Sequence, residues 1–234
     1  MTGRSRLSKQ KERDRKRKSK HLKQKSLIWV VTEGEKTEVE YVEWVSSQLP
    51  GDHILLKPTN PHASDPGSLC SYAKSLVSLD DKSAFVWIMS DVDDYQNTLR
   101  ALCPVSQAER VSGKVRWAIS NPSIDAWLVM HIRNVTNQYC ERDVFRQIGK
   151  NAGLLTGPNS KSINTEFLKG NSRQACVNAN SLHKQHESGG TLFPENNPCS
   201  DIPLFLKFVV DIHNQACRDS GALEHQVLSW EEIY

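Results

Sequence analysis

Carboxylates follow two apolar segments of this sequence, in a pattern that suits the binding of a metal ion. Glu33 comes directly after the apolar run at residues 27–32, and Asp91, Asp93 and Asp94 end a second run that begins at residue 84. Because side chains alternate along an extended chain, Asp91 and Asp93 are expected on the same side. Converging carboxylates repel one another unless protons or a cation compensate. Mg²⁺ prefers oxygen ligands and often joins carboxylates to phosphates, so we predict a site for Mg²⁺ or Mn²⁺ that acts on a phosphate.

Further charged residues follow the first of these acids. Glu35 and Lys36 precede a predicted helix and Glu38 falls in its first turn, where the helix dipole favours negative charge. Glu35 and Glu38 therefore either stabilise the helix or support the metal site. Glu35 and Lys36 are also candidate substrate contacts, with Lys36 predicted to contact a phosphate. Thr37 and Glu40 have the spacing of a capping box, so Glu40 is expected to cap this helix.

An Asp-x-Asp pair alone is a weak signal, and Asp94 is also a reasonable helix cap. Nucleotide-sugar transferases share such a pair, as do phosphatases with an aspartyl nucleophile. The phosphatase pattern has the pair on the first strand, with Thr or Val two residues beyond. This chain has the pair on its third predicted strand, and the residue two positions beyond the pair is Tyr95. The combination with Glu33 is what favours a metal site.

Strand-like and helix-like segments alternate in the first half of the chain and must position these acids. Apolar and β-branched runs predict strands at residues 27–32, 53–58, 84–94 and 115–120, with helices at 36–49 and 68–79. This alternation predicts an α/β fold of Rossmann type, with a parallel sheet covered by helices on both faces. Ligands bind at the carboxyl ends of such strands. Glu33 joins Asp91 and Asp93 if the first and third strands are neighbours.

Residues 134–234 contain no segment that predicts a buried strand, and helices are expected near 141–151, 160–168, 171–187 and 202–218. The last has an apolar stripe made of Ile202, Phe205, Phe208, Val209, Ile212 and Ala216. Ser200 or Asp201 is expected to cap it, with Pro203 in its first turn. We therefore expect a basic segment at 1–26, an α/β domain at 27–133, and a helical region at 134–234 packed on the sheet.

The basic segment differs in composition from the rest of the chain. Residues 4–25 hold twelve Lys or Arg against two acidic residues, a net charge of +10 in a chain whose formal charge is +3. Such a segment buries too little apolar surface to fold alone, so a disordered tail or a solvated helix is expected. We predict that it neutralises nucleic-acid phosphates through Arg13, Arg15, Lys16, Arg17, Lys18 and Lys20. The alternative is that it only keeps the protein soluble.

Other classes of protein are disfavoured by the sequence. No apolar run approaches the roughly 18 residues of a membrane span, and the basic start lacks the apolar segment of a signal peptide. A cytoplasmic protein is therefore expected. Six cysteines without a CxxC pair predict small buried side chains rather than a zinc site or a disulfide framework. No glycine-rich P-loop occurs, which argues against an ATPase.

A glutamate after the first strand and Asp-x-Asp after a later one resemble the Toprim fold of topoisomerases, primases and certain nucleases. More closely, the chain resembles the RloB-like family over about residues 27–212. The similar motifs, in order, are EGEKTE (33–38), DPGSL (65–69), DVDD (91–94), SNPSIDAWLVMH (120–131) and NNPCSDI (196–202). This resemblance implies a Toprim-like, metal-dependent nuclease of a prokaryotic anti-phage system, with Glu33, Asp91 and Asp93 as its acids. Because an active nuclease is toxic to its own cell, we also expect control by a defence-system partner protein or a phage-derived signal.

Two residues of the fourth motif are candidates for contact with the substrate. Asn121 ends the fourth predicted strand, close to the expected site. His131 lies one helical turn beyond Trp127, so it serves either as a core histidine or as a phosphate or metal contact. His183 and His186 have metal-like spacing on a helix but no third ligand nearby, so we expect them at the surface.

We predict an endonuclease that hydrolyses the phosphodiesters of RNA or DNA. In this hypothesis Asp91 and Asp93 hold the metal, whereas Glu33 binds a metal or accepts the proton of the attacking water. One alternative is a module on the same scaffold that binds nucleic acid or a partner without cleaving. Another is phosphoryl or nucleotidyl transfer, as in primases.

Overall fold

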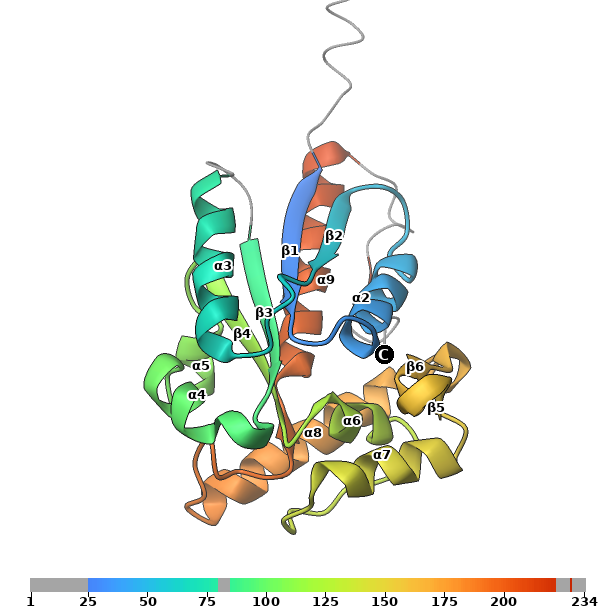
Figure 1. The fold of residues 1–234 in the computed structure, drawn as a ribbon. Helices are drawn as coiled ribbons and strands as arrows, with labels where there is room; N and C mark the ends of the chain where they lie inside the picture. The colour runs from blue at the N-terminus through green and yellow to red at the C-terminus, as the bar shows by residue number, and fades with distance from the viewer. Residues whose placement is uncertain (1–24, 80–84, 222–227, 229–234) are drawn as a thin grey trace, which may run out of the picture.

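The chain folds around a five-stranded sheet with helices on both of its faces (Figure 1). The computed structural model of the protein describes residues 25–79, 85–221 and 228. Residues 1–24 of the basic segment lie outside the described residues, and these include the six Lys and Arg residues that we predict to contact nucleic acid.

The elements up to the fourth motif are β1 (Ser26–Thr32), α2 (Thr37–Ser47), β2 (Ile54–Thr59), α3 (Pro66–Leu79), β3 (Phe85–Asp91), the 3₁₀ turn η1 (Asp93–Tyr95), α4 (Gln96–Leu102), α5 (Gln107–Arg110), β4 (Val115–Asn121) and α6 (Ile124–Val129). The remaining elements are α7 (Arg142–Asn151), β5 (Leu155–Thr156), η2 (Pro158–Ser160), β6 (Ser162–Ile163), η3 (Thr165–Phe167), α8 (Ser172–Ser188), β7 (Cys199–Ser200) and α9 (Ile202–Ser220).

The strand order of the sheet brings the two acidic segments together. The order is β2-β1-β3-β4-β7, with the first four strands parallel and β7 antiparallel to β4. Because β1 pairs directly with β3, the residues that follow these two strands lie at the same edge of the sheet. The expected α/β fold with a mostly parallel sheet is confirmed.

Both faces of the sheet are buried, as the apolar strand sequences predict. Along β3, Trp87 and Met89 join one core, and Val86 and Ile88 join the other. This alternation follows from the two-residue period of an extended strand. Helices α2 and α9 cover the first face and α3 covers the second (Figure 1).

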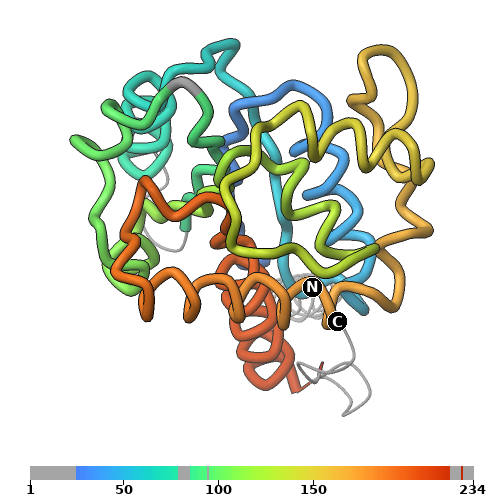
Figure 2. Tube along the Cα trace, turned by 90° about the horizontal axis from the view of Figure 1, so that it is seen from below, coloured from blue at the N-terminus to red at the C-terminus, as the bar shows by residue number. Residues whose placement is uncertain are grey.

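The second half of the chain covers one face of the sheet and also the edge where the parallel strands end. Helix α9 packs on the sheet through Phe205 and Val209, as its apolar stripe predicts. Helices α7 and α8 instead run across the edge where the parallel strands end, which Figure 2 views end-on. The helical region therefore forms part of the surroundings of the expected site.

Two expectations for this half are wrong. It contains strands: Ser200 in β7 pairs with Ser120 in β4, and β5 and β6 form a small hairpin. The helix expected at 160–168 is absent, and the 3₁₀ turns η2 and η3 take its place. A strand of two residues is too short to show an alternation in the sequence.

Of the two side chains expected to cap α9, only that of Ser200 accepts a hydrogen bond from the start of the helix, and the expectation of surface histidines is wrong. Asp201 stands at the N-cap position, but its carboxylate binds Arg110, with 2.8 Å between Nε and Oδ2. The amide of Ile202 donates to the Ser200 hydroxyl instead. His186 is buried, and the side chain of His183 is only 12% exposed beside Asp201.

The cysteines behave largely as expected. All six are free thiols, and five are buried, whereas Cys140 is partly exposed. Among the described helices, none combines the length and apolar character needed to cross a membrane.

Candidate functional site

A cleft of about 420 Å³ opens at the carboxyl edge of β1 and β3. Residues of both charge signs line it: the acids Glu33, Glu35, Glu38, Asp91 and Asp125, and the bases Lys36, Arg142, Arg146 and Lys161. The acids come from the first half of the chain, whereas three of the four bases come from the second half. The cleft is therefore formed by both halves together.

Glu33 and Asp91 meet at the base of this cleft. The Glu33 carboxylate accepts a hydrogen bond from the Asp91 backbone amide at 3.1 Å and another from the Ser90 hydroxyl at 2.9 Å, both at Oε2. The Asp91 side chain is buried, and its Oδ1 accepts the backbone amide of Ile124 at 2.9 Å. The condition set by the sequence analysis is met: β1 and β3 are neighbours, and they bring Glu33 to Asp91.

Asp93 lies near these acids, but it is not on the same strand as Asp91. The strand ends at Asp91, Val92 has helical dihedral angles, and Asp93 has a positive φ of 27°. The argument from an extended chain is therefore wrong for this pair. Asp93 forms an ion pair with Arg142 and is not among the cleft-lining residues. Asp94 lies in the turn η1, and its side chain is outside the described part of the structure.

Glu38 is a third carboxylate of the cluster. Its side chain is buried under Gly34, where an added Cβ would lie 2.0 Å from Glu38 Oε2. Position 34 therefore has to be glycine unless the Glu38 carboxylate moves. Of the two roles left open for Glu38, its position favours support of the acidic site.

The acids affect one another's protonation. Burial raises the pKa of Glu33 to about 7, although the hydrogen bonds from Asp91 and Ser90 act in the opposite direction. Burial raises the pKa of Glu38, and the charge of Asp125 adds to the increase. Burial also raises the pKa of Asp91 well above its usual range, with further contributions from Glu38 and Glu33. The cluster therefore carries more negative charge than its surroundings stabilise.

Helix α7 brings positive charge to the cleft. Arg142 and Arg146 lie one turn apart; Arg142 pairs with Asp93, and Arg146 pairs with Asp125 at 3.0 Å. Burial lowers the pKa of Arg142, but the charges of Asp91 and Asp93 outweigh this and raise it overall. Sequence reasoning missed both arginines, although their spacing of four on a predicted helix is a signal that they share one face.

Lys161 reaches the cleft through the β5–β6 hairpin. The Thr37 hydroxyl donates to the backbone oxygen of Lys161 at 2.8 Å, and Glu40 Oε2 accepts the amide of Ile163 at 2.7 Å. The expected capping box is therefore wrong, since α2 has no side-chain cap. Both residues instead hold the hairpin against the start of α2. Lys36, also at the cleft, has an exposed side chain.

Of the other predicted substrate contacts, Glu35 lines the cleft, whereas Asn121 and His131 are buried. Glu35 lines its rim and contacts His62 at 3.1 Å. Asn121 is buried and donates to the backbone oxygen of Pro194, so its amide serves the fold. His131 is buried against Trp127, and burial lowers its pKa to about 4. The structure therefore favours the core alternative for His131.

The acids are not already arranged as a metal site. Within residues 25–79 and 85–221, no group of three or more His, Cys, Asp or Glu side chains has the spacing needed to hold an ion. The side chains of Glu33, Glu38 and Asp91 would therefore have to close around one.

Comparison with known proteins gives one match. A family model described as RloB-like protein matches residues 28–209, which is more than half of the chain. Searches of curated proteins and of solved structures found no match.

Proposed function

Because the chain belongs to the RloB-like family, we propose that it is a metal-dependent nuclease of Toprim type, which cleaves nucleic-acid phosphodiesters in prokaryotic anti-phage defence. One observation carries this proposal. Two neighbouring parallel strands deliver Glu33 and Asp91 to the base of a cleft whose rim carries lysine and arginine side chains. Acids at the base suit a cation, and bases at the rim suit the phosphates of a substrate.

The donor set fits a hard divalent cation such as Mg²⁺ or Mn²⁺. Three carboxylates gather where burial already opposes their charge, and a cation would remove this penalty. Glu33 and Asp91 each use one carboxylate oxygen in the hydrogen bonds described above, which leaves the other oxygen of each as a ligand. Bound there, the ion would polarise a phosphoryl oxygen and lower the pKa of a water molecule.

The protein's own groups supply the remaining chemistry. Where Glu33 does not bind the ion, it is suited to accept a proton from the attacking water near neutral pH, because burial raises its pKa to about 7. Arg142 and Lys161 stand on the cleft wall, where they can hold the phosphate oxygens in position and offset the charge that develops on them.

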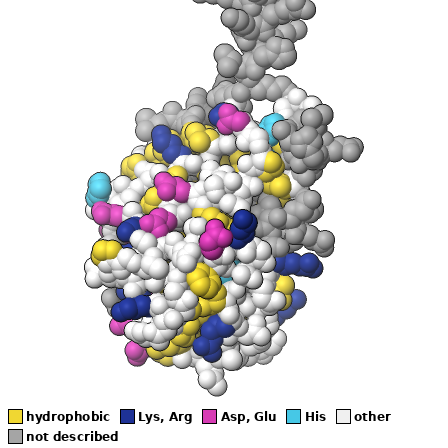
Figure 3. All heavy atoms as spheres, turned by 90° about the vertical axis from the view of Figure 1, so that its right-hand side faces the viewer, with side chains coloured by type: hydrophobic (Ala, Val, Ile, Leu, Met, Phe, Trp, Pro, Cys, Tyr) yellow, Lys and Arg dark blue, Asp and Glu magenta, His cyan; other side chains and the backbone are white. Residues whose placement is uncertain are grey.

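Binding of a long nucleic acid needs more contacts than the cleft provides. On the face shown in Figure 3, acidic and basic side chains are interspersed and no broad basic surface appears. The segment of residues 4–25, with its net charge of +10, is the richest source of phosphate contacts in the sequence. We assign it the role of holding the strand while the cleft acts on one phosphate.

Two observations favour a second candidate function, that of a module that binds nucleic acid or a partner without cleaving. The described carboxylates are not pre-arranged for a metal, and Arg142 already neutralises Asp93. In this case the cleft would bind phosphates through its bases alone.

One experiment distinguishes the nuclease from the binding module. Wild-type protein and Glu33→Gln are incubated with tRNA, single-stranded and duplex RNA and DNA, in Mg²⁺, Mn²⁺ or a chelator. The matched control is Glu43→Gln, an exposed glutamate on α2 away from the cleft. Metal-dependent cleavage by wild type and the control, lost in Glu33→Gln, supports the nuclease. Binding without cleavage under every condition would contradict it and favour the binding module.

A further inference from the structure

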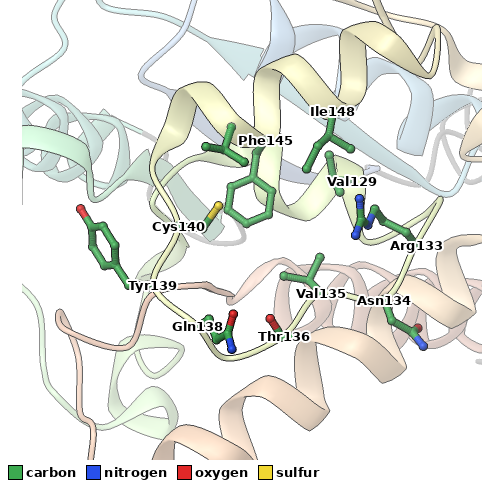
Figure 4. A pocket seen from close by; sticks show the side chains of 11 residues that line it. Val129, Arg133, Asn134, Val135, Thr136, Gln138, Tyr139, Cys140, Phe145 and Ile148 are labelled. Carbon is green, nitrogen blue, oxygen red and sulfur yellow. The ribbon is translucent and has the colours of Figure 1, made fainter.

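A second hollow lies on the other side of helix α7 from the acidic cleft. It has a volume of about 230 Å³ and is bounded by α7 and by the segment of residues 133–140 (Figure 4). We call it the α7 pocket. Its floor is apolar and consists of Val129, Val135, Phe145 and Ile148.

The wall of the α7 pocket carries polar side chains. Asn134, Thr136, Gln138 and Tyr139 line it, and Tyr139 is 73% exposed. Within the described part of the chain, no backbone or side-chain group of residues 134–139 forms an intramolecular hydrogen bond. An apolar floor surrounded by a few available polar groups is the usual composition of a small-ligand pocket.

The segment that forms this wall is nevertheless held at both ends. Asn178 of α8 donates to the backbone oxygens of Met130, at 2.9 Å, and Arg133, at 3.4 Å. At the other end, the backbone amide of Cys140 donates to Asn197 Oδ1 at 3.2 Å. These tethers fix the segment against α7, so its side chains stay beside the pocket.

Helix α7 connects the two hollows. Arg142 and Arg146 line the acidic cleft, whereas Val144 and Ile148 line the α7 pocket. At 100° per residue these two pairs lie on opposite faces of one helix, whose diameter with side chains is about 10–12 Å. A phosphate at the arginines and a base in the pocket are therefore separated by the width of one helix.

We propose that the α7 pocket receives an unpaired nucleobase of the strand whose phosphate occupies the acidic cleft. This inference rests on the proposed function and adds to it a substrate class, namely single-stranded or looped nucleic acid. A base ring fits an apolar floor of this size, Tyr139 offers a face for stacking, and the amides of Asn134 and Gln138 suit the polar edge of a base. Bases paired and stacked inside a duplex are not available to such a pocket.

The test measures binding in the presence of a chelator, so that it does not depend on cleavage. Fluorescence anisotropy compares single-stranded oligonucleotides of RNA and DNA, their duplexes, and abasic strands of equal length. Tyr139→Ala should weaken binding of the single strands roughly five- to 100-fold and leave the abasic strand unchanged. Tyr139→Phe, which keeps the ring, should bind as wild type does. Equal losses on the abasic and base-containing strands, or no loss on either, would overturn the proposal.

Cys140 provides an independent readout, because the other five cysteines are buried. Its alkylation rate, followed by mass spectrometry, should fall when the single strand is added and stay unchanged with the abasic strand. Gln138→Ala should reduce this protection, whereas the control Gln185→Ala on the exposed face of α8 should not. Protection by free mononucleotides but not by the strand would overturn the assignment to the substrate. If binding depends on the bases but no cleavage occurs, the nuclease proposal fails, whereas the proposed role of the α7 pocket in binding a base is supported.

Discussion

The Asp91 backbone amide donates to the Glu33 carboxylate at 3.1 Å, which joins the ends of two neighbouring strands at one point. Two acids that are 58 positions apart in the chain thereby lie at the base of one cleft. Burial raises the pKa of both carboxyl groups, and the charge of Glu38 adds to the increase in each. Such an arrangement costs stability in the absence of a cation, and this cost can be measured.

Glu33→Gln should stabilise the metal-free protein at pH 8. The folded-state pKa of about 7 lies above the ordinary value of 4.5, so stability is lost as pH rises through this window. Glutamine keeps the acceptor oxygen but carries no charge. Urea unfolding in a chelator should show a gain of up to roughly 3 kcal/mol at pH 8, and little gain near pH 4. A variant less stable than wild type at pH 8 would contradict the assignment of burial as the dominant effect.

Lys161→Ala should weaken the binding of nucleic acid by removing one phosphate contact at the cleft. Its effect should appear as a reduction of roughly 0.9 in the slope of log affinity against log salt concentration. Lys74→Ala, which removes an exposed lysine from α3, is the matched control and should leave the slope unchanged. Equal slopes for the two variants would remove Lys161 from the substrate site.

The basic segment should contribute several such contacts. Replacing Arg13, Arg15, Lys16, Arg17, Lys18 and Lys20 with glutamine keeps the length of the segment and removes six positive charges. The affinity for nucleic acid should fall at low salt, and the salt slope should decrease by several units. If the affinity stays constant while the protein becomes less soluble, the segment serves only solubility.

Asp201→Asn should destabilise the fold by about 3–5 kcal/mol, because it leaves the buried Arg110 without its carboxylate. Burial raises the pKa of Asp201, but the hydrogen bond from His183 and the charge of Arg110 lower it to about 2. This stability is present above pH 4 and is lost between about pH 4 and pH 2, so the difference from wild type should shrink there. Asp211→Asn, in an exposed pair with Lys207, should change stability by less than about 1 kcal/mol.

The sequence predicted the elements that depend on local pattern. The strands β1 and β3 carry apolar side chains on both of their faces. This pattern predicts strands that are buried on both faces in a parallel sheet. The pairing of β1 with β3 did not follow, because strand order depends on long-range packing. The sequence analysis could state this pairing only as a condition for bringing Glu33 close to Asp91. In the structure the two strands are paired.

Local reasoning failed where a distant segment competed for the same group. Thr37 and Glu40 have the spacing of a capping box, but they bind the hairpin more than 120 residues away. Asp93 was placed by the alternation of a strand that in fact ends at Asp91. The spacing of Arg142 and Arg146 indicates a shared helix face, but it does not show what that face contacts, because the partner Asp93 lies 49 positions earlier in the chain.

The central claim is that Glu33 and Asp91 hold one divalent cation together, and calorimetric titration with Mn²⁺ tests it most directly. Wild type and Glu43→Gln should bind Mn²⁺ equally, with release of protons at pH 7 because Glu33 is partly protonated there. Glu33→Gln and Asp91→Asn should each bind at least about tenfold more weakly. Absence of binding in wild type, or equal binding in all four proteins, would contradict the claim.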